Sequence, residues 1–371
     1  MTELNTNHKV SLRVLSPVHV GAGPDKSWFR GFDFVEKKDK IYVFLDKGKL
    51  LRSMSEQLLK RFTDTLATGK WDAVDKLLRE NVDLDAVASD IFPYNGKALS
   101  NEIKPLLRDG HNQPYLPGSS LKGAMASSIF HYLYAHVGPE RYNRHINNDL
   151  LGSFDQSLLR FVRPSDAEVQ GSAVTHVSLF NLYAQGSEWE SDFKDGFKIN
   201  LEHFTTDATG SFRLSIANGL GEFFRETSKR LGKPLLPKYY NQTIKATEPA
   251  EFLFKLINDC SRDHILREID FFDEFDQAED THLVLKQLRD LERMTSESPR
   301  VCVLRMAGHI GFHAITGDWR FKNHRSTLKT PDRDNVVFNQ SSRQKEPARY
   351  KSRKIVGSGD ELLLGFVRLE I

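Results

Sequence analysis

The sequence predicts an α+β protein, in which strands and helices occupy separate stretches of the chain. Apolar residues alternate with polar ones near the start, recur at helical spacing in two later stretches, and alternate again at the end. The regular strand–helix repeat of a doubly wound sheet is missing. With 371 residues, 39% of them hydrophobic, the chain can form two domains or one enlarged fold.

The first half contains four predicted groups of elements. A strand is expected at residues 9–15, because Val10, Leu12 and Val14 alternate with polar neighbours. A hairpin follows at 31–36 and 41–45. Helical spacing covers 50–80 with a break near Gly69, and another helix begins after Pro117. We expect Ser119 or Ser120 to be the N-cap of that helix.

The second half returns to strands and then to helices. Strands are predicted at residues 173–183, 197–204 and 212–216, a helical region at 219–293, and closing strands at 301–306 and 362–371. The shift to helix near Gly219 gives the predicted division into two parts. Residues 1–218 would form one domain with a helical insertion over about 50–170, and residues 219–371 the second.

Charge is unevenly distributed along the chain. The formal net charge is +2, but residues 320–354 contain 11 Lys or Arg against 3 acids. This basic segment therefore carries +8, and the remainder of the chain carries −6. Such a segment is typical of phosphate binding, and equally of a solvated loop.

Several function classes are excluded by what the sequence lacks. Cys260 and Cys302 are far apart and have no CxxC spacing, so neither a disulfide framework nor a zinc site is expected. No P-loop, dinucleotide-binding, zinc-protease or EF-hand motif occurs, and no cofactor is predicted. The start of the chain does not resemble a signal peptide and no apolar run could span a membrane, so a cytoplasmic protein is predicted.

Three glycine-rich turns are the candidate binding sites. The first is His19-Val-Gly-Ala-Gly23, the second is Pro117-Gly-Ser-Ser-Leu-Lys-Gly123 at a helix entrance, and the third is Gly308-His-Ile-Gly-Phe-His313 before the basic segment. Glycines let a backbone approach a ligand, and a helix entrance offers free amides to a phosphate. The alternatives are an ordinary strand-to-loop turn, a plain N-cap, and a turn with Phe312 and Trp319 in the core.

These motifs, with Leu15-Ser-Pro before the first and the ending Leu364-Gly-Phe-Val-Arg-Leu-Glu-Ile371, resemble the RAMP superfamily of CRISPR-associated proteins. Their order is most similar to the subunit that caps the backbone filament of type III-A (Csm) effector complexes at the 3′ end of the guide RNA. The resemblance implies a ferredoxin-like (RRM-related) RAMP fold with helical insertions and a smaller second RAMP-like half.

The resemblance also implies a function. It predicts a non-catalytic RNA-binding subunit that binds the 3′ part of the guide RNA (crRNA) and supports its maturation and antiviral defence. Expected partners are the backbone and small subunits, with host nucleases as a further candidate. Carried over by position, the RNA-binding residues are His19, Gly21, Gly23, Gly118, Ser119, Ser120, Lys122, Gly123, Gly308, His309, Gly311 and Arg320.

Three features suggest other functions. His19 could act in a metal-independent RAMP endoribonuclease that processes guide precursors, which is the alternative function. Asp33 could be catalytic, although the sequence places it on the solvent face of a strand. Residues 268–280 contain seven acidic residues, which suggests Mg²⁺ binding. The simpler alternative is a helix that buries Ile269, Phe272 and Phe275 and exposes its acidic side chains to solvent. A protein-only adaptor that recruits nucleases through this acidic region is a third option.

Overall fold

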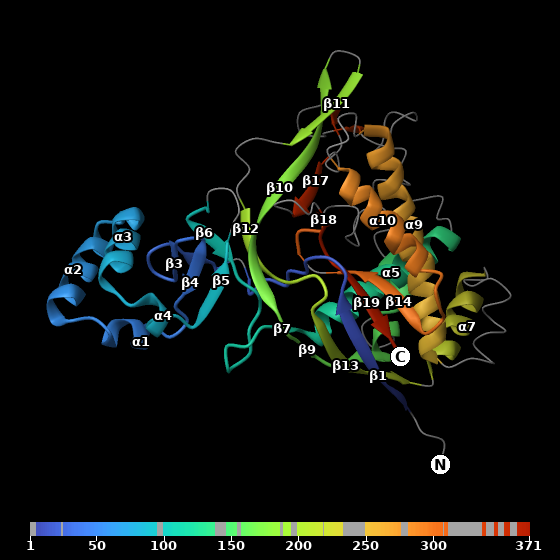
Figure 1. The fold of residues 1–371 in the computed structure, drawn as a ribbon. Helices are drawn as coiled ribbons and strands as arrows, with labels where there is room; N and C mark the ends of the chain where they lie inside the picture. The colour runs from blue at the N-terminus through green and yellow to red at the C-terminus, as the bar shows by residue number, and fades with distance from the viewer. Residues whose placement is uncertain are drawn as a thin grey trace.

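The molecule consists of two mainly antiparallel sheets and a group of helices, with a small helical module at one end (Figure 1). The computed structural model describes residues 5–23, 25–94, 99–137, 146–153, 157–185, 188–193, 199–217, 219–232, 249–275, 281–306, 308–310, 336–338, 345–347, 352–356 and 362–371. The α+β class predicted from the sequence is confirmed. None of the described helices is long and apolar enough to cross a bilayer.

The first sheet is built around the N-terminal strand. Its order is β14–β19–β1–β13–β9–β7, and β8 also pairs with β13. Val10, Leu12 and Val14 of β1 are buried and their neighbours are not, as the alternation predicts. The strands are β1 (Asn5–Val14), β7 (Tyr115–Leu116), β8 (Val162–Pro164), β9 (Ala167–Val169), β13 (Thr209–Ala217), β14 (Val301–Arg305) and β19 (Phe366–Glu370).

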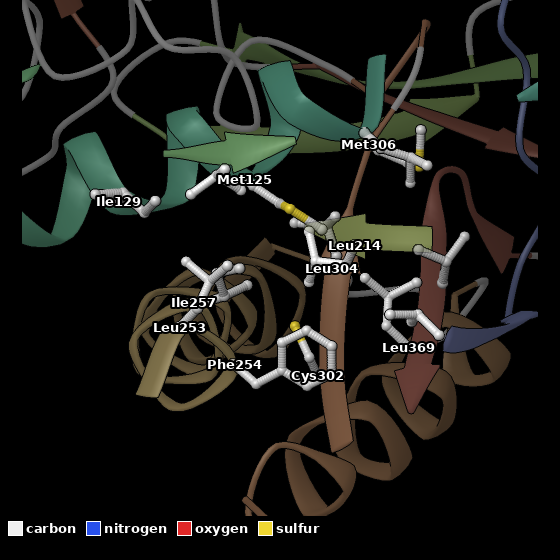
Figure 2. Packing of buried hydrophobic residues seen from close by; sticks show 14 of the residues in the cluster. Met125, Ile129, Leu214, Leu253, Phe254, Ile257, Cys302, Leu304, Met306 and Leu369 are labelled. Carbon is white, nitrogen blue, oxygen red and sulfur yellow. The ribbon is translucent and has the colours of Figure 1, made fainter. Parts of the chain in front are cut away.

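Helices α5 (Gly118–Val137) and α9 (Pro249–Phe275) cover one face of this sheet. In the shared core the Met125 side chain of α5 extends toward Leu304 of β14, and Ile129 of α5 and Leu253 of α9 belong to the same cluster (Figure 2). In the simplest ferredoxin-like unit the strand after the second helix would pair with the first strand. Here β19 takes that place beside β1, and β14 lies outside β19.

The second sheet has the order β18–β17–β10–β12–β6–β2, with β11 paired to β10. It shares a core with α10 (His282–Met294) and the second half of α9, where Phe180, Phe272, Leu288 and Phe366 meet. The strands are β2 (Trp28–Phe29), β6 (Glu102–Lys104), β10 (Ser172–Gln185), β11 (Glu188–Phe193), β12 (Ile199–Phe204), β17 (Ser352–Val356) and β18 (Leu362–Leu363).

Strands from both sides of residue 219 enter both sheets, since β14, β17, β18 and β19 pair with or beside strands of the first half. The division into domains 1–218 and 219–371 therefore stays a prediction. The remaining elements are α6 (Ile146–Leu151), the 3₁₀ turn η2 (Leu158–Arg160), α7 (Leu220–Leu231), β15 (Val336–Phe338) and β16 (Lys345–Pro347). The basic segment is described only at 336–338, 345–347 and 352–354.

The small module confirms the predicted hairpin and helix pair. Strands β3 (Phe34–Lys37) and β4 (Lys40–Val43) pair antiparallel around Lys38 and Asp39, whose φ values of 50° and 57° suit a tight hairpin turn. Gly69, at φ 68°, ends the first helix of the pair. The other elements of the module are α1 (Lys47–Arg52), α2 (Glu56–Ala67), α3 (Trp71–Asn81), α4 (Leu84–Val87) and β5 (Asp90–Pro93).

Two amide side chains pair with the backbone of outer strands. Asn258 of α9 donates to the carbonyl of Val301 at 2.7 Å and accepts from the amide of Val303 at 2.9 Å. Gln287 of α10 does the same with both backbone groups of Leu363, at 3.1 and 2.9 Å. Each amide therefore occupies the position of a neighbouring strand on β14 or β18.

Candidate nucleic-acid interface

The loop after β1 is held by hydrogen bonds to two distant strands. The amide of Gly365 donates to the carbonyl of Pro17 at 2.9 Å, and the amide of Phe366 donates to Ser16 Oγ at 3.0 Å. Val18 exchanges two backbone hydrogen bonds with Phe204 at the end of β12. The loop that carries His19, Gly21 and Gly23 is consequently fixed between the two sheets.

The late glycine turn meets this loop directly. The amide of Gly308 donates to the carbonyl of His19 at 2.8 Å, and the ring centroids of His19 and His309 lie 5.4 Å apart. His309 has φ 62°, a conformation that a non-glycine residue rarely adopts outside functional or tightly constrained positions. The first and third turns, separate in sequence, thus form one site. The predicted site residues Gly311 and Arg320 lie outside the described residues.

A cleft of about 380 Å³ opens where these two turns meet. Its walls also include the end of a strand that the sequence did not point to, through Lys104 of β6 and the adjacent Pro105. The lining residues are His19, Gly21, Ala22, Gly23, Lys104, Pro105, Gly308 and His309. Glycines make up three of these eight, so the backbone is exposed to whatever enters.

His19 is oriented by a backbone hydrogen bond. Its Nδ1 lies 2.7 Å from the carbonyl oxygen of Glu202, and a carbonyl can only accept, so Nδ1 carries the proton. The residue is 3% exposed, and burial lowers the pKa of His19 below its usual 6.5 against the opposing effect of this hydrogen bond. A neutral imidazole therefore presents an unprotonated Nε2 at neutral pH.

Glu202 holds the wall behind His19. Its carboxylate accepts from the amide of Leu106 at 2.9 Å and contacts the guanidinium of Arg108, while its backbone carbonyl accepts a hydrogen bond from His19 Nδ1. Burial raises the pKa of Glu202, and Arg108 opposes the shift. Glu202 thus links the histidine to the segment that follows Lys104.

One lysine lines the cleft and a second contacts one of its histidines: these are Lys104 and Lys354. Lys354 of β17 donates to His309 Nδ1 at 3.1 Å, which leaves the proton of the neutral His309 ring on Nε2. Burial and then the Lys354 charge lower the pKa of His309 to about 4. Lys104 donates to Ser27 at 2.8 Å and also contacts Glu102. Sequence reasoning missed both lysines as site residues: Lys354 was one of 11 basic residues, and Lys104 had no distinguishing neighbour.

The second glycine turn lies apart from this cleft and was partly misread. The helix begins at Gly118, and the carbonyl of Pro117 accepts from the amides of Ser120 and Leu121, so neither Ser119 nor Ser120 is the N-cap. The Gly118 amide donates to the carboxylate of Asp166 at 2.7 Å. A Cβ at Gly118 would lie 2.4 Å from the carbonyl oxygen of Pro164, which explains the glycine by packing.

The other predicted RNA contacts of this turn are not among the residues that line the cleft. These are Ser119, Ser120, Lys122 and Gly123; Ser119 and Gly123 are exposed, and Ser120 and Lys122 are partly buried. An RNA contact at the α5 entrance stays a prediction. The Asp166 carboxylate there would compete with a phosphate for the first helix amide.

Two sequence interpretations are wrong in their local geometry. Asp33 lies in the turn before β3, not on a strand, where its carboxylate accepts from the amide of Phe29 and from Lys47 at 2.8 and 2.7 Å. Glu268 is not on the wet side of its helix, because it is buried against Arg353. Within the described residues, no group of three or more His, Cys, Asp or Glu could hold a metal ion.

Acid is expected to destabilise the fold through His203, which lies next to Glu202. Burial lowers the pKa of His203 to about 4, so the unfolded chain binds this proton more tightly than the folded one. The associated stability is complete above pH 6.5 and is lost as the pH falls toward 4, by about 1–3 kcal/mol. Urea unfolding at pH 7 and pH 4.5 measures the loss. His203→Gln should weaken the pH dependence and His111→Gln, at an exposed histidine, should not; equal dependence in all three proteins would contradict the assignment.

Comparisons with known proteins agree with the resemblance in the motifs. The CRISPR system Cms protein Csm5 of Streptococcus thermophilus is 31% identical over 137 residues, a match that covers 33% of this chain and spans only 37% of that relative. A chain of the Csm–crRNA–target RNA ternary complex of a type III-A CRISPR–Cas system has the same fold, with TM-score 0.63 and 18% identity, covering 98% of this chain and 100% of that one.

Csm5 of T. onnurineus also has this fold, with TM-score 0.57 and 16% identity over 96% of this chain and 99% of the other. At such identities the structural likeness concerns the fold. The RAMP superfamily model, in contrast, matches residues 11–321 and so includes the loop after β1, the α5 entrance and the late glycine turn. The chain therefore belongs to the RAMP superfamily.

Proposed function

We propose that this protein is a non-catalytic RNA-binding subunit of a type III-A CRISPR effector ribonucleoprotein, and that its cleft holds the 3′ part of the guide RNA. The observation that carries the proposal is the cleft itself, where two glycine turns, two histidines and Lys104 meet and where Lys354 contacts one of the histidines. Main-chain amides and ammonium groups suit phosphate oxygens of any sequence. The likeness to Csm5 and to a chain of a Csm–crRNA complex supports the choice of RNA and of complex.

The rest of the proposal concerns assembly. As a capping subunit, the protein would contact the backbone and small subunits, and it would support guide maturation by host nucleases and thereby antiviral defence. Expression with those subunits tests this part, because a capping subunit co-purifies with them and with guide RNA. Recovery of a complete complex without this chain would contradict the capping role.

Catalysis by the two histidines as an acid–base pair is disfavoured by the protonation of His309. RNA cleavage without metal needs a base for the 2′-hydroxyl and an acid for the leaving oxygen. His309, with its pKa lowered to about 4, is neutral at pH 7 and a poor proton donor there. Incubation with labelled repeat RNA in EDTA tests this reading, and site-specific cleavage that His19→Ala abolishes would overturn it.

RNA affinity is expected to fall steeply with salt, and to do so less in a double variant that carries Lys104→Ala and Lys354→Ala. Each phosphate contact to single-stranded RNA changes the slope of log K against log salt by about 0.7, so the double variant should lose about 1.4 from the slope. Fluorescence anisotropy of the full chain with labelled guide RNA over a salt series measures both slopes.

The matched control is Lys60→Ala, at an exposed lysine of α2 in the small module. It removes the same type of charge at a residue that does not line the cleft. The slope of log K against log salt should therefore equal that of the native protein. An affinity that does not change with salt, or equal slopes in the double variant and the native protein, would contradict RNA binding in the cleft.

A further inference from the structure

His19 Nε2 is a hydrogen-bond acceptor in a cleft whose other described side chains supply donors or apolar surface. Lys104 is a cation, His309 has its proton on Nε2, and Ala22 and Pro105 are apolar. The proton of His19 is on Nδ1, which donates to the carbonyl oxygen of Glu202. Within the described residues His19 Nε2 has no hydrogen-bond partner, although only 3% of the residue is exposed.

The group that fits this acceptor must be a donor. A phosphodiester has acceptor oxygens only, so a phosphate would be repelled by the Nε2 lone pair and attracted by the lysines beside it. The sugar–phosphate backbone of RNA has one donor, the ribose 2′-hydroxyl, and the backbone of DNA has none. An acceptor placed beside cations is thus complementary to a ribose next to its phosphate.

We propose that His19 Nε2 accepts a hydrogen bond from a ribose 2′-hydroxyl, so that this cleft distinguishes RNA from DNA. The inference rests on the proposed function, because it assumes that the cleft holds a nucleic-acid backbone. His19 acts as a recognition residue and not as a base, since no proton has to leave the hydroxyl.

Two glycines keep the edge of the ring accessible. A Cβ on Gly21 would lie 2.9 Å from His19 Nε2, and a Cβ on Gly308 would lie 3.4 Å from the Cδ2 atom of the same ring. A methyl group on Gly21 would therefore occupy the approach to Nε2. The substitution removes neither His19 nor either lysine. Gly21→Ala consequently removes the acceptor without removing the charge of the cleft.

The test compares guide RNA with the same RNA in which 2′-fluorine replaces the 2′-hydroxyls. Fluorine keeps an RNA-like sugar but cannot donate a hydrogen bond. The full-length native protein should bind the fluorinated RNA about three- to tenfold more weakly, which corresponds to one hydrogen bond. In Gly21→Ala the affinity for guide RNA should fall, because Gly21 lines the cleft, and the ratio of the two affinities should approach one. Loss of the ratio in the variant isolates the His19 contact from hydroxyl contacts elsewhere.

Gly110→Ala is the control, because a Cβ there meets no atom within 4 Å and Gly110 is in another loop. It should keep the native ratio. Equal affinity of the native protein for both RNAs, or an undiminished ratio in Gly21→Ala, would overturn the proposal while RNA binding itself stands. No binding to either RNA would instead contradict the proposed function, so the two failures are distinguishable.

Discussion

Replacement of Glu268 by alanine is expected to lower the free energy of unfolding by about 3–5 kcal/mol, since removal of one partner of a buried ion pair leaves the other charge without its counter-ion. Arg353 Nε lies 2.6 Å from Glu268 Oε2, and the two side chains are only 6% and 2% exposed. Arg305 is buried nearby: burial lowers the pKa of Arg305 to about 10, and the Glu268 carboxylate opposes the shift. One carboxylate thus offsets two buried guanidinium groups.

The loss should extend to the cleft, because Arg353 and Lys354 are neighbours on β17 with opposite roles. Arg353 is held in the interior, where its guanidinium also lies 3.8 Å from the ring centre of Phe271. Lys354 reaches His309 from the same strand. Loss of the Glu268 carboxylate removes a side-chain contact that helps to hold β17, although the strand stays paired with β10, and RNA affinity should fall with stability.

Urea unfolding of the Glu268→Ala protein measures the first effect, and anisotropy with guide RNA measures the second. Asp270→Asn is the matched control, because Asp270 lies two residues away on α9 and is exposed. It should change the unfolding free energy by less than about 0.5 kcal/mol. Similar losses in the two variants would contradict the buried ion pair.

The second large effect is expected for Gly365→Ala, with a loss of about 2–5 kcal/mol and of most RNA binding. Gly365 has φ 99°, and a Cβ there would lie 2.4 Å from both Met306 O and Ile310 Cγ2. Its amide also donates to Pro17, and its carbonyl accepts from the amide of Met306 at 2.8 Å. This glycine therefore joins the two chain segments that carry the cleft.

Gly69→Ala separates strain from steric overlap. Gly69 also has a positive φ, 68°, but a Cβ there meets nothing within 4 Å. Its cost should be limited to the conformational term of about 1–2 kcal/mol, and RNA binding should be unchanged. Thermal unfolding and anisotropy of both variants give the comparison; if Gly365→Ala cost no more than Gly69→Ala and bound RNA normally, the joining role would be refuted.

Local patterns were enough to predict most elements but not how the two halves combine. The alternation in β1 and the helix break at Gly69 depend on near neighbours, and both are confirmed. The pairing of Leu12 with Leu369 is invisible to such patterns, because it joins opposite ends of the chain. The two halves interleave through this pairing in the first sheet and through the pairing of β10 with β17 in the second.

The same limit applies to the site. Glycine turns with a histidine are a local signal, so His19, Gly21, Gly23, Gly308 and His309 were predicted, and the structure brings them together. Lys104 and Lys354 are single lysines on strands, and nothing nearby in sequence distinguishes them from solvated ones.

Glu268 was misread for a related reason. Its partner Arg353 lies 85 residues further along the chain, so the surrounding acids hid the one that is buried.

The side chains of Asn258 and Gln287 restrict where a partner molecule can pair a strand with this chain. A strand from another molecule could add to β14 or β18 only by displacing these amides from Val303 and Leu363, and the helices that carry them cover the core beneath. The side chains of α9 and α10 therefore block strand addition at β14 and β18. A strand from a partner molecule would have to pair with a different strand edge of this chain. The fold of the single chain therefore limits where a partner can add a strand.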